Sequence, residues 1–406
     1  MSVRPSPAGA IPGTVVALGF VSLFMDVSSE MIHSLLPVFL VSGLGASALS
    51  VGIIEGIAEA TASITKVFSG VVSDWVGRRK PLLLLGYGMA ALSKPVFPLA
   101  DSLGTVLLAR FLDRIGKGVR GAPRDALVAE VTPVSLRGAA FGLRQSMDTV
   151  GAFAGPALAM LLMLLGGGDV RLVFWVAVIP AMIAVAVIVV GVREPDTDQP
   201  VEPGAERRRF PIRRSELRRL GGHYWGVVAL ASALTLARFS EAFLLLRAQT
   251  LGMADAYAPL VLIVMNVVYA ASAYPLGRLA DRLDRRALLA LGVGLLVLAD
   301  LVLAAAGSLW AVLAGAAVWG LHMGATQGLL AVFVADAAPA HLRGTAFGLY
   351  NLVTGLALLA ASALAGALWT MAGPAATFLA GAGFAALSLV GLLALAPRTD
   401  GGSSEP

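Results

Sequence analysis

Three ionisable side chains lie on one face of an apolar segment near the start of the chain. Asp26, Glu30 and His33 stand at positions i, i+4 and i+7, which a helix places on one side. An ionisable residue in a segment that crosses a membrane is costly and therefore indicates a functional site. Burial favours the protonated form of a carboxyl group, and a nearby guanidinium favours the ionised form. Glu30 or Asp26 beside an arginine therefore predicts a group that takes up and releases a proton.

Other apolar segments supply the arginine and further acids for this chemistry. The segment 104–128 is rich in bases, and we expect its Arg114 to modulate the proton site. Because an isolated charge is costly in lipid, these acids and bases should face one another or a wet cavity. The predicted proton-coupling residues are Asp26, Glu30, Glu59, Arg114 and Asp148.

The apolar segments of the second half carry fewer charges than those of the first half. This asymmetry predicts that the first half holds the proton site and that the second half supplies more of the substrate surface. The residues predicted to bind the substrate are Glu30, His33, Arg110, Lys117, Arg144, Arg238, Glu241, Asn266 and His322.

The composition indicates that these segments lie in a membrane. Hydrophobic residues make up 58% of the chain and charged residues 14%, whereas a soluble domain carries about 25% charged residues. The net charge of +5 does not indicate nucleic-acid binding, because the basic residues gather in short loops between apolar segments. The chain has no cysteine, which excludes disulfides, thiolate metal sites and a cysteine nucleophile.

Twelve segments are long and apolar enough to cross the hydrocarbon as helices. They are 14–40, 47–72, 81–100, 104–128, 138–165, 172–192, 223–250, 256–277, 287–306, 309–335, 342–371 and 374–396. The first run lacks a cleavage site, so we expect it to be a retained span rather than a signal peptide. An even number of spans and Arg-rich loops at 73–81, 193–222 and 277–287 predict a multi-pass protein of a bacterial inner membrane with both termini cytoplasmic.

The two halves of the chain repeat each other. LRGAAFGLRQ at 136–145 matches LRGTAFGLYN at 342–351, and Ser29-Glu30 recurs as Ser240-Glu241. A six-helix unit used twice in one orientation predicts two bundles related by an axis along the membrane normal, with a cavity between them. We expect the first bundle at 1–192, a cytoplasmic linker at 193–222, the second bundle at 223–397 and a disordered tail at 398–406.

Three short motifs resemble signatures of the major facilitator superfamily, in order and at the spacing of that family. The stretch from Gly70 to Lys80, GVVSDWVGRRK, resembles its loop signature between the second and third helices. Arg114-x2-Lys117-Gly118 resembles its fourth-helix arginine motif, with lysine where glutamine is usual. The pattern Gly142-x8-Gly151-x3-Gly155-Pro156 is similar to the fifth-helix signature of its antiporters, although the usual final pair of glycines is missing.

The resemblance implies a twelve-helix secondary transporter that works by alternating access. It also implies a conformational latch at the cytoplasmic loops, to which we assign Gly70, Asp74, Gly77, Arg78, Arg137, Asp281 and Arg343. Together with the intramembrane acids, it predicts proton-coupled export of a small organic compound. The expected partners are this substrate, protons and the lipid bilayer, with no nucleic acid and no cofactor, and the expected state is a monomer.

Two other functions remain open from the sequence. Asp26, Glu30 and His33 are also metal-ligand types, and with Glu59 and His322 they could serve an exporter of divalent metal ions or metal chelates. A membrane receptor or scaffold that kept the fold and lost transport is the other alternative. The chain contains no GxxxxGK[ST] pattern, which argues against an ATP-driven pump, and no catalytic signature that would indicate an enzyme.

Overall fold

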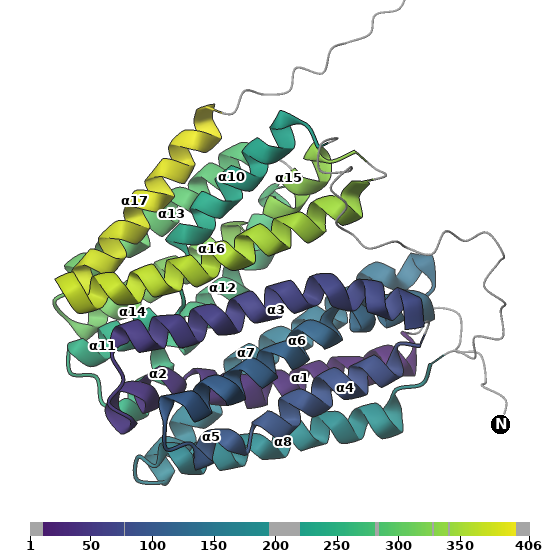
Figure 1. Cartoon of the computed structure of the whole chain (residues 1–406), viewed down its shortest axis with the longest axis horizontal. Coiled ribbons are helices and arrows are strands. Elements are labelled where there is room, and N and C mark those ends of the chain that lie inside the picture. Colours follow the sequence, from purple (N-terminus) through teal and green to yellow (C-terminus); the bar gives the residue numbers. More distant parts are fainter. Residues whose placement is uncertain are drawn as a thin grey trace, which may run out of the picture.

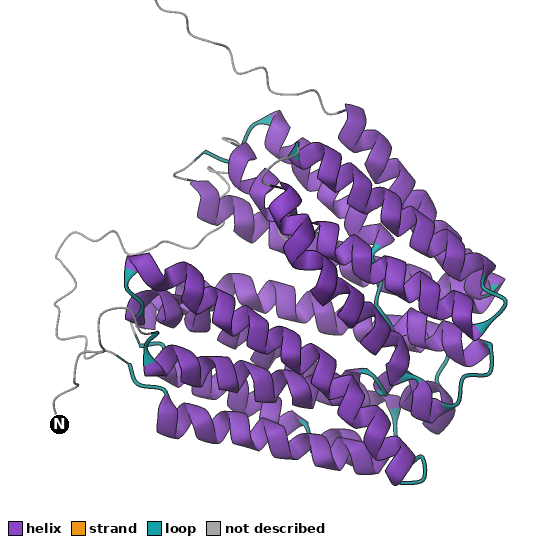
Figure 2. Ribbon diagram, turned by 180° about the vertical axis from the view of Figure 1, so that it is seen from behind, coloured by secondary structure: helices purple, strands orange, loops and turns teal. Residues whose placement is uncertain are grey.

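The computed structural model describes residues 11–76, 78–194, 220–280, 284–326, 329–339 and 342–394. Within these residues every regular element is a helix and no strand occurs, which confirms the predicted all-α class (Figure 2). Most of the predicted linker and the whole predicted C-terminal tail lie outside the described residues.

The first half, which we call the N-half, contains six spans made of the helices up to Gly191. These are α1 Gly13–His33, α2 Leu36–Val38, η1 Phe39–Gly43, α3 Ala48–Val76, α4 Lys80–Ser93, α5 Val96–Leu99, α6 Leu103–Val131, η2 Val134–Leu136, α7 Arg137–Leu165 and α8 Val170–Gly191.

The second half, or C-half, repeats this arrangement from Gly222 onward. Its helices are α10 Gly222–Ala237, α11 Ala242–Thr250, η3 Asp255–Tyr257, α12 Pro259–Ala280, α13 Arg285–Ala305, α14 Leu309–Thr326, α15 Leu329–Ala337, α16 Arg343–Ala372 and α17 Pro374–Ala394.

Eleven of the twelve predicted spans are long and apolar enough, among the described residues, to cross a membrane. The twelfth, α6, has 29 residues and is therefore long enough at about 1.5 Å per residue, but it is the most highly charged. Its Arg110, Asp113 and Arg114 are buried within the protein. The charges of α6 therefore avoid lipid by facing the interior of the bundle.

Within the described residues, three predicted continuous spans contain a break between helices, after His33, after Ser93 and after Ala237. The span 223–250 separates into α10 and α11 at Arg238–Glu241. Hydroxyl groups compensate the exposed backbone there: the Ser362 Oγ accepts from the Ser240 N–H at 3.3 Å, and the Ser240 Oγ accepts from the Ala242 N–H at 3.2 Å. A break at mid-span is tolerated in a membrane where it lines a cavity.

Helix packing follows the sequence repeat. In the N-half α1 packs on α7 and α8, and α6 packs on α3 and α4. In the C-half α10 packs on α16 and α17, and α14 packs on α12 and α13. Figure 1 shows the two bundles side by side, so the predicted pair of six-helix units is confirmed.

The halves meet mainly through α3 against α16 and α7 against α12. We call the end of the molecule that holds Glu194 and Leu220 the linker side, and the opposite end the far side. On the far side a Cβ on Gly52 would lie 2.1 Å from the Ser362 carbonyl oxygen, and a Cβ on Gly366 would lie 2.6 Å from the Ala48 oxygen. Glycine is what allows α3 and α16 to approach so closely there.

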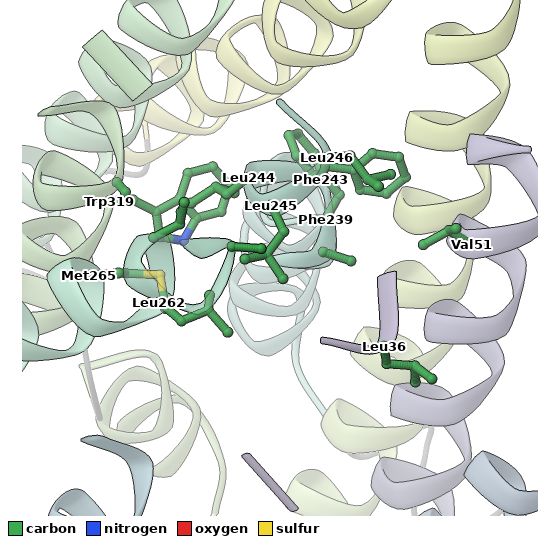
Figure 3. Packing of buried hydrophobic residues seen from close by; sticks show 14 of the residues in the cluster. Leu36, Val51, Phe239, Phe243, Leu244, Leu245, Leu246, Leu262, Met265 and Trp319 are labelled. Atoms are coloured by element: carbon green, nitrogen blue, oxygen red, sulfur yellow. The ribbon is translucent and has the colours of Figure 1, made fainter. Parts of the chain in front are cut away.

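The hydrophobic core shows the same difference between the two ends. One cluster of buried side chains runs through both halves, and Figure 3 shows part of it around Leu36, Val51, Phe243, Met265 and Trp319. Two further clusters each belong to a single half, one containing residues of α1 and α8 and the other residues of α10 and α16. The halves therefore share a core toward the far side, and in Figure 1 α3 and α16 diverge toward the linker side.

Candidate functional site

A cavity of about 430 Å³ lies between the two halves at mid-span. The N-half supplies a strongly charged wall, and the C-half supplies the break between α10 and α11 with aromatic and hydroxyl groups around it. The lining residues used below are Glu30, His33, Glu55, Glu59, Arg114, Lys117, Arg238, Phe239, Glu241, Trp319 and Tyr350.

The deepest ion pair of the charged wall joins α3 and α6. The Arg110 guanidinium donates to both carboxylate oxygens of Glu55, from Nε at 3.2 Å and from Nη2 at 2.8 Å, and both residues are buried. The same Nη2 lies 3.1 Å from Nδ1 of His33 on α1. A two-point pair of this kind holds both groups in fixed orientations. His33 is therefore positioned by the arginine.

Arg114 faces the cavity one turn further along α6. Its Nη1 lies 3.0 Å from a carboxylate oxygen of Glu59 on α3, and its Nε lies 3.7 Å from Asp113. Asp113 also accepts a hydrogen bond of 2.9 Å from Lys94, whose ammonium lies 3.0 Å from the Ser29 hydroxyl. The arginine that we expected to modulate Glu30 or Asp26 thus pairs with Glu59 in this conformation.

Four charged groups of the cavity have no such partner. Glu30, Lys117, Arg238 and Glu241 form no ion pair with any described residue. Glu30 and Glu241 belong to the repeated Ser-Glu dipeptides, so each half contributes one equivalent carboxylate. These groups are available to bind a proton or a charged substrate.

Close packing of α1 on α7 fixes the position of the α1 acids. A Cβ on Gly151 would lie 2.8 Å from the Cβ of Asp26, and a Cβ on Gly155 would lie 2.6 Å from the Cβ of Glu30. Pro156 is buried beside this contact. By contrast, a Cβ on Gly142 would meet nothing within 4 Å. Two of the three motif glycines are therefore required by packing in this conformation.

Six of the predicted site residues do not line the cavity, and one of them is Arg110, which lies behind Glu55. Arg144 pairs with Asp148 on the same helix at 2.5 Å, and Asn266 donates across the halves to the Ala152 carbonyl at 3.1 Å. Nδ1 of His322 lies 2.7 Å from the Gly292 carbonyl oxygen. Asp26 forms no ion pair with a described residue and lies against Gly151.

The ligand types proposed for a divalent metal are not gathered into one group. No cluster of three or more His, Cys, Asp or Glu side chains that could hold a metal ion occurs among the residues that the structure describes. His33 is engaged by Arg110, and His322 is bonded to the backbone of α13.

The predicted latch is only partly within the described residues. Gly77 and Asp281 lie outside them, as do the side chains of Asp74 and Arg343. Arg78 and Arg137 are exposed, and a Cβ on Gly70 would make only an ordinary contact of 3.6 Å with Ala122.

The helix ends beside the loops contain a repeated ion pair that the predicted latch did not include. Arg79 lies 2.9 Å from Glu130, and Arg285, 206 residues further on, lies 3.4 Å from Asp336, also 206 residues further on. Arg79 also donates through its backbone N–H to Glu194. The sequence contained a signal for this pair, because Glu130 and Asp336 occupy the same position in the repeat of the two halves.

Several cavity residues were not among the predicted site residues. Glu55 stands four residues before Glu59 and could have been found from that spacing. Phe239, Trp319 and Tyr350 could not be found in this way, because aromatic residues in an apolar span carry no sign of which face meets the cavity.

Comparisons with known proteins agree with the fold. The family model described as Major Facilitator Superfamily matches residues 18–246 and 239–406. An uncharacterised MFS-type transporter of Methanocaldococcus jannaschii is 32% identical over 388 residues, which cover 94% of each chain. The inner membrane transport protein YajR of Escherichia coli is 27% identical over 397 residues, covering 93% of this chain and 80% of the relative.

A solved structure of the nucleoside transporter NupG has the same architecture. It superposes with a TM-score of 0.77 at 12% sequence identity, over 95% of this chain and 100% of that chain. Identity this low supports the shared fold and says nothing of the substrate.

Proposed function

The chain belongs to the major facilitator superfamily of membrane transporters, and we propose that it exports a small organic compound in exchange for protons. The observation that carries this proposal is Glu30, a carboxylate that lines the cavity between the halves and has no ion-pair partner among the described residues. Antiport through one cavity requires a group there that binds a proton in the absence of the substrate and gives it up when the substrate binds. The partial antiporter motif, of which Gly151 and Gly155 pack against α1, supports export as the direction.

Charge balance explains how a proton on Glu30 would act. The cavity wall includes the carboxylates Glu30, Glu55, Glu59 and Glu241. The matching cations are Arg114, Lys117 and Arg238 from the lining, with Arg110 behind Glu55. One proton on Glu30 leaves this set with an excess positive charge, which weakens the binding of a cationic substrate and favours its release.

The linker side is the cytoplasmic side in this proposal. Arg78 and Arg79 precede α4 at that end and Lys80 begins it, and basic segments of this kind remain in the cytoplasm. With the halves sharing a core on the far side, the conformation described here is the one that receives substrate from the cytoplasm. The proposed location is a bacterial inner membrane, and the latch at the linker-side loops remains a prediction.

The first experiment measures proton movement in inside-out vesicles with a pH-sensitive dye and a panel of drugs, metabolites and metal ions. We expect an organic compound to trigger proton release in the wild type. The Glu30→Gln variant should release protons at least about tenfold more slowly, which corresponds to about 1.4 kcal/mol. Asp26→Asn is run beside it, because Asp26 lies on the same helix outside the cavity lining.

The controls separate this proposal from its alternatives. Asp255→Asn, on a far-side loop where the carboxylate only accepts a bond from Gln249, should retain the wild-type rate. Equal release in the wild type and in Glu30→Gln would remove Glu30 from the mechanism. Release triggered only by metal ions would replace the organic substrate with a metal, and a membrane-inserted protein that moves neither would favour a receptor or scaffold.

A further inference from the structure

An aspartate in the C-half is buried without a partner. Asp300 lies within α13 and is 0% exposed. Neither of its carboxylate oxygens forms a hydrogen bond, and no described residue forms an ion pair with it. Buried carboxylates are normally paired or hydrogen-bonded, because burial of an isolated ionised carboxylate is among the most costly arrangements in a protein.

The carboxyl group lies directly behind the wall of the cavity. A Cβ on Gly381 of α17 would lie 2.6 Å from Oδ2 of Asp300 and 2.8 Å from the ring of Phe239. Phe239 itself lines the cavity at the break between α10 and α11. Its ring packs against those of Trp319 and Phe378, each with centroids 5.6 Å away. The Phe239 ring, which lines the cavity, therefore lies next to the Asp300 carboxyl group.

The repeat shows what the same position does in the N-half. Asp300 stands 206 residues after Lys94, the same spacing that relates Gly292 to Gly86 and Arg285 to Arg79. Lys94 is also buried, but its charge is matched by Asp113 at 2.9 Å and by the Ser29 hydroxyl at 3.0 Å. At the position equivalent to Asp113 the C-half has Trp319. The C-half thus keeps an ionisable group at this depth and lacks its counter-charge.

The ionisable groups on the neighbouring elements form no hydrogen bond with either carboxylate oxygen of Asp300. On α14, Nδ1 of His322 lies 2.7 Å from the Gly292 carbonyl oxygen. On α11, the Arg247 guanidinium donates to backbone carbonyls at the end of α13, the shortest bond being 2.6 Å to Ala306. Arg238 and Glu241 line the cavity beyond Phe239. The helix α17 has no ionisable side chain in its described range.

We propose that Asp300 is a proton-binding site of the C-half, neutral in this conformation and ionised when Phe239 moves and cavity water reaches it. The O–H bond of the carboxylic acid then breaks, the proton passes to a water molecule of the cavity, and the carboxylate remains. This site is separate from Glu30 and requires no particular substrate. It places a second titratable group beside the broken span of the C-half, on the opposite wall from the proton site of the N-half.

Infrared difference spectroscopy on the full chain in lipid nanodiscs tests the protonation directly. Near neutral pH an ordinary aspartate is ionised. We expect the wild type to show the C=O stretching band of a carboxylic acid without a hydrogen bond, and Asp300→Asn to lose it. Asp336→Asn, which removes an exposed carboxylate near the end of α15, should keep the band. A wild type and an Asp300→Asn variant with the same carboxylic-acid bands would overturn the proposal.

Thermal unfolding of the detergent-purified full chain provides a second measurement. The folded protein holds a proton at Asp300 that the unfolded chain releases, so wild-type stability should fall relative to Asp300→Asn as the pH rises above about 4. The ratio of the two unfolding constants should change by up to about tenfold per pH unit. A ratio that stays constant with pH, as expected for Asp336→Asn, would contradict the proposal. Neither measurement depends on transport, so its failure would leave the role of Glu30 untouched.

Discussion

At the scale of single residues, the N-half buries several of its charges inside the membrane as ion pairs. Lys94 and Asp113 are 2% and 3% exposed, and they satisfy each other with help from Ser29 and Arg114. Removing one partner of a buried pair leaves the other charge uncompensated, which costs far more than the pair contributes. An ion pair on the same helix but at a more exposed site, Arg124–Asp125, is worth little by comparison.

The first prediction compares these two aspartates of α6. Asp113→Ala should destabilise the protein by about 3–5 kcal/mol, because it leaves the Lys94 ammonium buried without a counter-charge. Asp125→Ala should cost at most about 1 kcal/mol, because the Asp125 side chain is 40% exposed. Thermal unfolding in detergent measures both, and Lys94→Met added to Asp113→Ala should recover part of the loss. Equal losses of stability from the two single variants would contradict the conclusion that the buried Lys94 ammonium depends on Asp113 for its counter-charge.

At the scale of elements, the contact between α1 and α7 decides where Glu30 lies. The backbone of α1 passes so close to Gly155 that a Cβ there would lie 2.9 Å from the Val27 carbonyl oxygen. Backbone atoms cannot rotate away as a side chain can, so any added carbon must separate the helices. Glu30 follows Val27 by less than one turn and would move with it.

The second prediction uses the motif glycines as a matched pair. Gly155→Ala should destabilise the protein by about 1–3 kcal/mol through overpacking and should reduce substrate-triggered proton release by displacing Glu30. Gly142→Ala on the same helix should be neutral or stabilising by up to about 1 kcal/mol, because nothing lies within 4 Å of the added carbon. Unfolding temperatures and vesicle proton flux measure the two effects. A Gly155→Ala variant as stable as the wild type would show that α1 and α7 do not hold this contact.

At the scale of the whole molecule, closure of the far side rests on α3 against α16. Gly52, Gly56 and Gly366 bring these helices into backbone contact there. Nearer the linker side, a Cβ on Gly355 would meet Ser63 at 3.0 Å and the backbone of Ala60 only at 3.7 Å. A side chain added at the far end should therefore bias the molecule away from the conformation described here.

The third prediction measures that bias. Because the chain has no cysteine, Thr235→Cys introduces a single thiol into the cavity wall. Adding Gly52→Ala should lower its labelling by an impermeant maleimide in inside-out vesicles about tenfold, corresponding to a shift of about 1.4 kcal/mol. Gly88→Ala, where the added carbon meets nothing within 4 Å, should leave labelling unchanged. Labelling that Gly52→Ala does not alter would mean that this glycine contact does not control closure.

The sequence by itself determined the number of spans, the repeat of the two halves and the family. Each depends on features read along the chain: runs of apolar residues, the recurrence of LRG-AFGL 206 residues later, and loop motifs of fixed spacing. It also pointed to much of the cavity wall, since Glu30, His33, Glu59, Arg114, Lys117, Arg238 and Glu241 all line it. For these residues a charge within a span was a sufficient signal, because a charged side chain inside the membrane is costly and indicates a functional site.

Only the tertiary structure decided which charges pair and which remain free. Arg114 pairs with Glu59 and not with Glu30, Asp148 pairs with Arg144 away from the cavity, and Asp300 pairs with nothing described. The physical reason is that hydropathy and spacing are summed along one helix, whereas an ion pair depends on the rotation and depth of two helices relative to each other. Glycine contacts such as Gly155 on α1 set that rotation, and they exist only once the helices are packed.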